Sequence, residues 1–438
     1  MNSLQRKPLL PEDKSPAFAF VLTLLFSLIV IIRPQEIFTP LNGIPFIAVL
    51  SILILVIILL AHRPIQIVPQ HIALLIICPH VVISGILNGW PGEGVAEAQV
   101  YLVSCVIPLF IFSTVYSSKS RQIVFMWFSL FAAMVMVHNG YTQQQSPSGY
   151  GWTGTSHVEA AHRITYLGIL KDPNDLGLFF MMNIPFSIYF IKHAKFLGKL
   201  ISLSLLGGLL YGIYMTNSRG AMLALAGMTA LYLLITYGGT KAIILGLTLS
   251  PPAIFVASIF RTVSSQEASA MGRLWAWWDG LEMLKANPIF GVGSNNFIDY
   301  HGKVAHNTYI QVAAEIGLVG YLLWMTLLLL TLYMGFSVIS KIKNIDKEKL
   351  TETMKIEGAL CTTCFYSLCG FSMSAFFLTR NFFIIFYMVA GMAIASYFRF
   401  IKENNGQSLF EYKTVIKNVV FIALSVLIFI YIILKFTV

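Results

Sequence analysis

Long apolar runs recur along the whole chain, and short polar segments separate them. A helix that crosses a membrane needs about 20 mostly apolar residues, because the hydrocarbon core is about 30 Å thick. By this criterion the sequence predicts thirteen transmembrane helices, at residues 17–32, 44–61, 72–87, 98–116, 122–138, 176–191, 198–214, 220–237, 242–260, 308–335, 358–378, 382–398 and 418–434. We therefore expect an all-α polytopic integral membrane protein with about 12–13 spans, in which residues 1–438 form a single membrane domain.

Two of the longer connections, residues 139–175 and 261–307, carry polar motifs. Long loops in compact proteins are usually functional or disordered. Within the second loop an apolar face recurs at helical spacing, and it consists of Leu274, Trp277, Trp278, Leu281 and Leu284. A Trp-rich amphipathic helix of this kind lies in the membrane interface. It is either an anchor for the loop or one wall of a lipid-facing site, and the sequence leaves both interpretations open.

The composition excludes an ordinary soluble protein, because 57% of the residues are hydrophobic and only 11% are charged. Soluble domains carry about 25% charged residues. If the N-terminus is cytoplasmic and the helices alternate, most of the 29 Lys and Arg residues fall in cytoplasmic segments, as the positive-inside rule requires. The two long loops then face the outer side. The net charge of +10 is mainly a topology signal, and no nucleic-acid partner is needed to explain it.

No motif in the sequence indicates a metal or a nucleotide. The five cysteines all lie in predicted spans. Cys361 and Cys364 have a zinc-like spacing, but no second pair or nearby histidine completes a tetrahedral site. We interpret these residues as small packing side chains at helix contacts, and we predict no metal site.

Three arginines on the outer side come from separate parts of the chain. Arg163 lies in the first long loop, Arg219 at the outer end of the span 220–237, and Arg273 in the second long loop. A guanidinium group can form two parallel hydrogen bonds to a phosphate. A single interfacial arginine is more often structural, but three that converge with His306 on one face would indicate an anionic site.

His306 and Asn307 stand where the second long loop enters the span 308–335. Asn307 can cap the helix by accepting its first amide protons, and a helix N-terminus favours anions. A neutral imidazole can accept a proton. Glu315 lies about 12–14 Å further along the helix at 1.5 Å per residue, nearly opposite His306. We predict that Glu315 bonds a neighbouring helix or a re-entrant backbone, with a direct substrate role as the alternative.

Two further polar motifs have structural explanations. Asp172, Asn174 and Asp175 can cap the helix that Pro173 begins. The turn at residues 291–297 could bring backbone amides to an anion.

Taken in order, these motifs resemble those of the O-antigen ligase and O-antigen polymerase superfamily of bacterial envelope enzymes. The resemblance is strongest over residues 160–325, and it is carried by RPQE, RITYL, DPND, SRG, GR, NPIFGVGSNNF and HNTYIQVAAEIGLVG. It implies the membrane glycosyltransferase type of fold, known as GT-C-like, with a cavity open to the periplasm. It further implies that a glycan is taken from a polyprenyl (undecaprenyl) diphosphate carrier by a metal-independent, inverting transfer that needs no cofactor.

The resemblance also assigns roles to particular residues. Arg163, followed four residues later by Leu167, matches the arginine of an R-x-x-x-L motif, and Arg219 and Arg273 match arginines of the diphosphate region. His306 matches the essential histidine of the second outer loop. Asn307, Asn174 and Glu315 are expected to support the site. The family ligases typically have twelve spans, so the thirteenth predicted here, residues 418–434, is an added helix.

The function implied is that of a glycan ligase in the bacterial inner membrane, with its active site facing the periplasm. Its expected partners are a lipid-linked glycan donor, membrane lipid and an acceptor, for which lipid A-core is the first candidate. A polymerase or a protein-glycosylating enzyme of the same superfamily is the alternative. A lipid-linked oligosaccharide flippase belongs to another class, and transporters of that class often show repeated halves and broken helices.

Overall fold

The computed structural model describes residues 16–62, 65–158, 162–239 and 266–437. These residues form helices joined by loops, and the β-structure among them is limited to the isolated bridges Tyr150–Ser156 and Val158–Arg163. Eight of the described helices are long and apolar enough to cross a membrane. The prediction of an all-α polytopic membrane protein is therefore confirmed.

The helices correspond closely to the predicted apolar segments. Their bounds are α1 (Ala17–Ile31), α3 (Phe46–Ala61), α4 (Pro69–Leu87), α5 (Pro91–Tyr101) continuing through a π-turn into α6 (Ile107–Val115), α7 (Lys119–Gln145), α8 (Pro173–His193), α9 (Phe196–Thr216), α10 (Arg219–Tyr237), α14 (Thr308–Asn344), α15 (Glu352–Ser374), α16 (Ile384–Glu403) and α17 (Tyr412–Thr437). The predicted span 242–260 lies outside the described residues. Shorter helices are α2 (Pro34–Ile37), α12 (Gln266–Ala286) and α13 (Phe297–His301).

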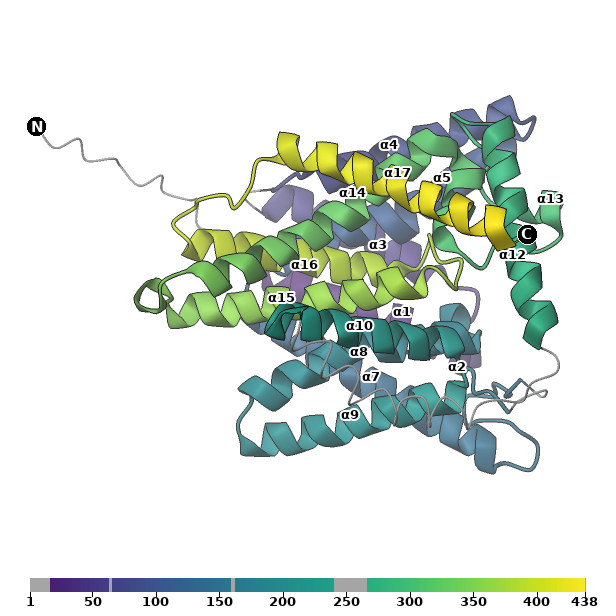
Figure 1. The fold of residues 1–438 in the computed structure, drawn as a ribbon. Helices are drawn as coiled ribbons and strands as arrows, with labels where there is room; N and C mark the ends of the chain where they lie inside the picture. The colour runs from purple at the N-terminus through teal and green to yellow at the C-terminus, as the bar shows by residue number, and fades with distance from the viewer. Residues whose placement is uncertain (1–15, 63–64, 159–161, 240–265, 438) are drawn as a thin grey trace, which may run out of the picture.

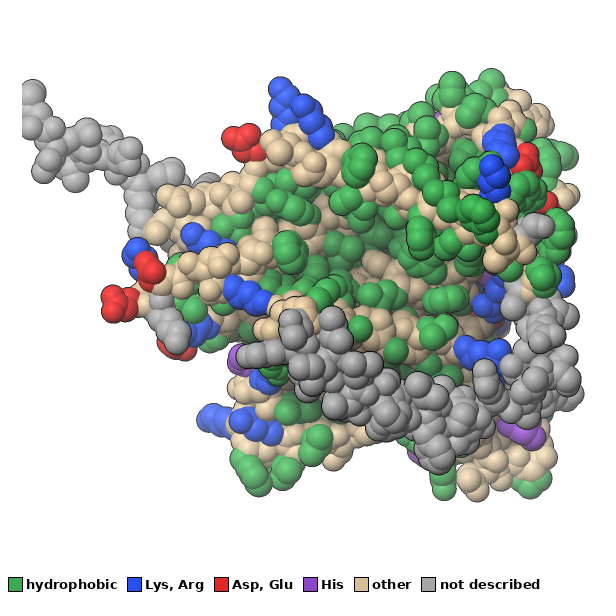
Figure 2. All heavy atoms as spheres, in the orientation of Figure 1, with side chains coloured by type: hydrophobic (Ala, Val, Ile, Leu, Met, Phe, Trp, Pro, Cys, Tyr) green, Lys and Arg blue, Asp and Glu red, His purple; other side chains and the backbone are tan. Residues whose placement is uncertain are grey.

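The long helices lie side by side in a bundle, and α12 runs across one end of it (Figure 1). The most apolar stretch of α16 is 89% buried, whereas those of α9, α10 and α17 are 28%, 22% and 28% buried. Helix α16 therefore belongs to the core, and the other three present apolar side chains outward. Figure 2 shows this apolar outer face, with Lys and Arg side chains gathered toward the two ends of the bundle.

Helix α12 confirms the amphipathic helix that the sequence predicts in the second long loop. Trp277 donates its indole N–H to the carbonyl of Ala305 at 2.9 Å, and Leu281 is buried. On the other side, the Asp279 carboxylate accepts from His301 Nδ1 at 2.6 Å. The helix thus fixes the loop that leads into α14.

The predicted span 308–335 is interrupted in the structure, because α14 breaks at Gly317, whose φ is +66°. A break leaves backbone groups without intrahelical partners, and each one costs free energy in a membrane unless it is paired. A re-entrant segment, residues 288–293, supplies the partners. The carbonyls of Ala314 and Glu315 accept from the amides of Val292 and Gly293 at 3.0 and 2.9 Å.

Two further hydrogen bonds pair backbone groups at the break in α14. The Leu318 amide donates to the Pro288 carbonyl at 2.8 Å, and His80 Nε2 donates to the Ile316 carbonyl at 2.8 Å. The re-entrant segment is itself held to α4, because Ser84 donates its hydroxyl to the Phe290 carbonyl at 2.6 Å. The sequence predicts one continuous helix here, because the residues around Gly317 are apolar on both sides, and the break corrects that prediction.

The predicted boundaries around residues 375–383 are also corrected. The span 358–378 was expected to be helical throughout, but α15 ends at Ser374 and the next residues form a non-helical connection to α16. Their backbone groups bind the start of α14 instead. Thr308 donates its amide to the Ala375 carbonyl at 2.7 Å and its hydroxyl to the Leu378 carbonyl at 2.6 Å.

We expect Gly317→Ala to destabilise the fold strongly. A Cβ atom at this position would lie 2.3 Å from the Ile289 carbonyl oxygen, and a positive φ costs a non-glycine residue about 1–3 kcal/mol. The thermal midpoint of the detergent-solubilised protein, followed by fluorescence-detected size exclusion, should fall. Gly207→Ala on α9 is the matched control, because a Cβ there meets nothing within 4 Å. Equal midpoints for the two variants would contradict the account of the break.

Candidate functional site

The first long loop carries Arg163 and fixes its side chain. Arg163 donates Nε to the Thr216 carbonyl at 2.9 Å and Nη2 to Asn174 Oδ1 at 2.8 Å. The same Asn174 oxygen accepts the Ser218 hydroxyl at 2.8 Å. Asn174 therefore ties the first loop to the start of α10, which begins at Arg219.

The helix that Asn174 starts is capped as the sequence predicts. Asp172 Oδ1 accepts from the Asn174 amide at 2.7 Å and from its side-chain Nδ2 at 2.8 Å, and Pro173 occupies the first turn. Asp172 has a second effect, because it places a negative charge beside Arg163.

The RPQE motif supports the first loop from α1. The Arg33 side chain lies directly over Gly168, where a Cβ atom would come within 1.9 Å of Nε. Tyr166 donates its hydroxyl to the Ile32 carbonyl at 2.9 Å. We infer that this motif positions the loop, since Arg33 is already paired with Glu36.

Arg219 and Arg273 are differently placed from Arg163. Arg219 is exposed at the first position of α10, and Arg273 is partly buried on α12. Neither guanidinium makes a hydrogen bond or an ion pair with the residues that the structure describes.

His306 and Asn307 form the entry to α14. Asn307 caps the helix as predicted, because its Oδ1 accepts from the amides of Tyr309 and Ile310 at 3.0 and 3.2 Å. The imidazole of His306 is partly exposed and makes no hydrogen bond to the described residues. Its φ of +50° is uncommon for a residue other than glycine, and such a backbone marks a position that the surrounding structure holds in place.

The pKa values of Arg163 and His306 show which charged groups act on each of them. Burial lowers the pKa of Arg163, and the charges of Arg219 and Arg273 lower it further, while Asp172 opposes them. Burial likewise lowers the pKa of His306, and Arg273 and then Arg380 and Lys303 add to this effect against Asp172. Interactions of this kind require the groups to lie near one another. Arg273 is the shared neighbour, because its charge acts on both Arg163 and His306, while Arg219 acts on Arg163 and Arg273.

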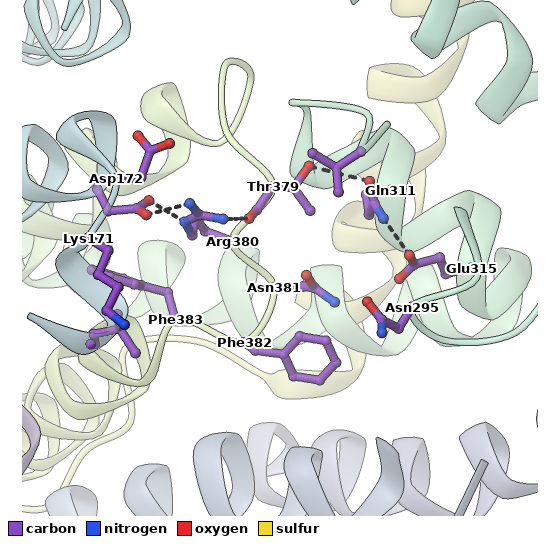
Figure 3. Close-up of a pocket in the computed structure, with 14 residues that line it drawn as sticks. Lys171, Asp172, Asn295, Gln311, Glu315, Thr379, Arg380, Asn381, Phe382 and Phe383 are labelled. Atoms are coloured by element: carbon purple, nitrogen blue, oxygen red, sulfur yellow. Dashed lines mark hydrogen bonds and ion pairs between the residues drawn. The ribbon is translucent and has the colours of Figure 1, made fainter. Parts of the chain in front are cut away.

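The Glu315 side chain is bound by backbone that follows the re-entrant segment and by its own helix, close to the backbone contact that the sequence predicts. Its carboxylate accepts from the backbone amides of Asn295 and Phe297 and from the side chain of Gln311. Gln311 is oriented in turn by the Ala305 amide, which donates to its Oε1 at 2.8 Å. Glu315 nevertheless also lines a cavity, shown in Figure 3, that reaches Asp172 and Arg380 in the region of the arginines.

The sequence analysis did not select Arg380. It lies in the connection 375–383 and forms a two-pronged ion pair with Asp175, which is almost completely buried at 4% exposure. Its amide donates to the Thr308 hydroxyl at 3.0 Å. Arg380 therefore joins α8, α14 and α15 at this end. The available signal was a charged Arg380-Asn381 pair in a short outer connection between two apolar spans.

Among the described residues, no group of three or more His, Cys, Asp or Glu side chains could hold a metal ion. Cys361, Cys364 and Cys369 are buried within α15, as expected for packing residues.

Fold and site together define a polytopic membrane protein that gathers positive charge and one imidazole at one end of its bundle. Comparison with known proteins gives two matches, each over part of the chain. Residues 203–325, which include Arg219, Arg273, His306 and Glu315, match the sequence model of the family described as O-antigen ligase. The chain is also 26% identical over 235 residues to the exopolysaccharide production protein ExoQ of Rhizobium meliloti (strain 1021). That match covers 42% of this chain and 49% of ExoQ, about half the length of this relative. The two matches agree with the resemblance to the O-antigen ligase superfamily that the motifs show.

We expect His306 to titrate below 6.5, its ordinary pKa, because burial and the charge of Arg273 both disfavour the imidazolium. Removing that charge should move the pKa upward, so Arg273→Gln should raise the pH at which His306 gains its proton. NMR of histidine-labelled protein measures this, with the resonance assigned by its loss in His306→Gln. Lys199→Gln, at the opposite end of the bundle, is the control. If the pKa of His306 is unchanged in Arg273→Gln, the charge of Arg273 does not act on the imidazole.

Proposed function

We propose that the protein transfers a glycan from undecaprenyl diphosphate to the hydroxyl group of an acceptor, at the periplasmic face of the bacterial inner membrane. The observation that carries this proposal is the position of Arg273, whose charge acts on His306 on one side and on Arg163, together with Arg219, on the other. Two of these guanidinium groups have no partner among the described residues, and their electrostatic coupling costs stability unless an anion is present.

The arginines suit the donor's diphosphate. A sugar on a diphosphate already has a good leaving group, so the main demand is to stabilise the charge that grows on it. Arg219 and Arg273 provide oriented donors for phosphate oxygens, and interactions that strengthen with developing charge accelerate the reaction. Arg163 is held by Asn174 and supports them with further positive charge.

His306 is the candidate general base. Its pKa is lowered, which keeps the imidazole neutral and able to accept the proton of the attacking hydroxyl. The oxygen of the acceptor forms the new bond to the anomeric carbon while the bond to the diphosphate breaks. The proton passes to His306, and direct displacement inverts the anomeric configuration once. These steps require no metal or other cofactor.

The comparisons favour two types of enzyme, a ligase and a polymerase, which differ in their acceptors. The family match favours a ligase, for which lipid A-core is the expected acceptor. The ExoQ match favours a polymerase, because the name of that relative refers to exopolysaccharide production. Deleting the gene distinguishes them. Accumulation of long glycan on the lipid carrier supports the ligase, and accumulation of single repeat units supports the polymerase.

We expect Arg219→Lys and Arg273→Lys to impair transfer although both keep the charge. A lysine ammonium cannot form the paired hydrogen bonds of a guanidinium, and the loss of one charged hydrogen bond corresponds to roughly 10- to 100-fold in kcat/KM. Initial rates with purified protein in liposomes measure this. Arg121→Lys, near the start of α7, is the matched control and should retain its rate. Full activity in both test variants would identify these arginines as interfacial anchors.

We expect His306→Ala to bind the lipid-linked donor normally but to transfer glycan about 10²–10⁴-fold more slowly, the usual contribution of a general base. Glu315→Gln should be far less affected, since the amide keeps one acceptor oxygen for the backbone of Asn295 and Phe297. Donor binding and transfer are measured on the same preparations. A folded Glu315→Gln protein with no transfer would make Glu315 part of the chemistry.

A further inference from the structure

The cavity beside the arginines has a volume of about 470 Å³, within the range of about 300–1,000 Å³ typical of small-molecule sites. Its lining comes from separate elements: the segment after Leu167, the re-entrant loop, α14 and the connection 375–383. Figure 3 shows these side chains facing one another across the opening. The two ends of the cavity differ in chemistry.

One end is charged. Lys171 and Asp172 lie there, together with the ion pair between Asp175 and Arg380. This end connects the cavity to the region of His306, because Asp172 and Arg380 both act on the pKa of its imidazole. An anionic group held by the arginines would therefore lie at this mouth.

The other end is built from amides, one carboxylate and an aromatic ring. Asn381 donates Nδ2 to the Tyr101 hydroxyl at 3.3 Å, and its Oδ1 has no partner among the described residues. The side chain of Asn295 is exposed to the cavity and makes no hydrogen bond to the described residues. Glu315 lies beside Asn295, and Gln311 donates to its carboxylate. Phe382 closes this end, with its ring 4.4 Å from that of Tyr101.

These groups match the needs of a sugar. Hydroxyl groups both donate and accept, so they pair with amide side chains, which offer both functions, and with carboxylates, which accept. Asn381 and Glu315 are each held by a hydrogen bond, which lowers the entropic cost of binding. A flat aromatic side chain such as Phe382 covers the apolar face of a ring. The absence of a cation from this end, among the described lining residues, argues against a phosphate there.

We propose that this end of the cavity binds a sugar residue of the substrate next to the diphosphate. The inference rests on the proposed function and identifies the part of the substrate that the cavity holds. The sugar belongs either to the donor glycan or to the acceptor, since both must meet beside His306. A site that bonds hydroxyl groups also discriminates between sugars, because an analogue that lacks a hydroxyl leaves buried polar groups unpaired.

Asn295→Gly tests the proposal with little risk to folding. Asn295 has a φ of +67°, which glycine adopts without strain, so the variant removes the amide and preserves the turn. Asn405→Gly is the matched control, because Asn405 is also exposed, has a φ of +60° and does not line the cavity. Phe382→Leu is a second test variant that keeps bulk but removes the aromatic face.

The probes are undecaprenyl diphosphate alone and the lipid-linked glycan extracted from a strain that lacks the gene. If the donor sugar occupies the cavity, Asn295→Gly should bind the glycan-bearing lipid about 3- to 10-fold more weakly, with unchanged binding of undecaprenyl diphosphate. If the acceptor sugar occupies it, both lipids should bind normally and the acceptor KM should rise by a similar factor, with kcat nearly unchanged. Either result supports the sugar subsite.

Two results would overturn the subsite while leaving the proposed function intact. In the first, Asn295→Gly and Phe382→Leu match Asn405→Gly in every measurement. In the second, both lipids bind equally weakly to Asn295→Gly, which would place the diphosphate itself in the cavity. Failure of the proposed function gives a different result, because the unmodified protein would then neither bind undecaprenyl diphosphate nor transfer glycan.

Discussion

The close approach of two backbones at Gly291 and Gly317 is the constraint on which the site end of the protein depends. A Cβ atom on Gly291 would lie 2.4 Å from the Glu315 carbonyl, and one on Gly317 would lie 2.7 Å from the Gly291 amide. Both residues have positive φ. Because only glycine allows this contact, the re-entrant segment can enter the bundle and pair the backbone groups that the break in α14 exposes. The break thereby places Glu315 against Asn295 and keeps the first turns of α14 aligned with His306.

The site end of the bundle carries several arginines and few acidic partners for them. The arginines at this end repel one another, and the protein neutralises them only in part. Asp172 lies beside Arg163, and Asp175 is committed to Arg380. At the opposite end, the buried Arg399 is fully engaged, since it donates to Glu357 at 2.8 Å and to Gln122. A paired buried arginine is structural, whereas Arg219 and Arg273, which have no partner within the described ranges, suit the anionic substrate proposed above. Asn174 links the start of α8 to the arginines, because it donates to the capping Asp172 and orients Arg163.

Much of the fold could be predicted from the apolar runs, since each span must reach across the bilayer and satisfy its own backbone. The interruption at Gly317 could not be predicted. The backbone groups that it exposes are paired by residues 288–293, and the sequence near Gly317 carries no sign of that contact. The arginines and His306 were found because their residue types are costly near lipid. Arg380 was missed, since a short polar connection between two spans is usually a solvated turn. The cavity depends on four separate segments, and its existence could only be seen once they were assembled.

The measurement that tests the central claim most directly follows both products of a single reaction. Purified protein in liposomes is given the lipid-linked glycan and its acceptor, and phosphorus NMR records undecaprenyl diphosphate while mass spectrometry records the glycosylated acceptor. The account predicts that one undecaprenyl diphosphate is released for each glycosidic bond formed, with inversion at the anomeric carbon. Movement of intact lipid-linked glycan across the bilayer, with no diphosphate released and no bond formed, would contradict it and identify a transporter.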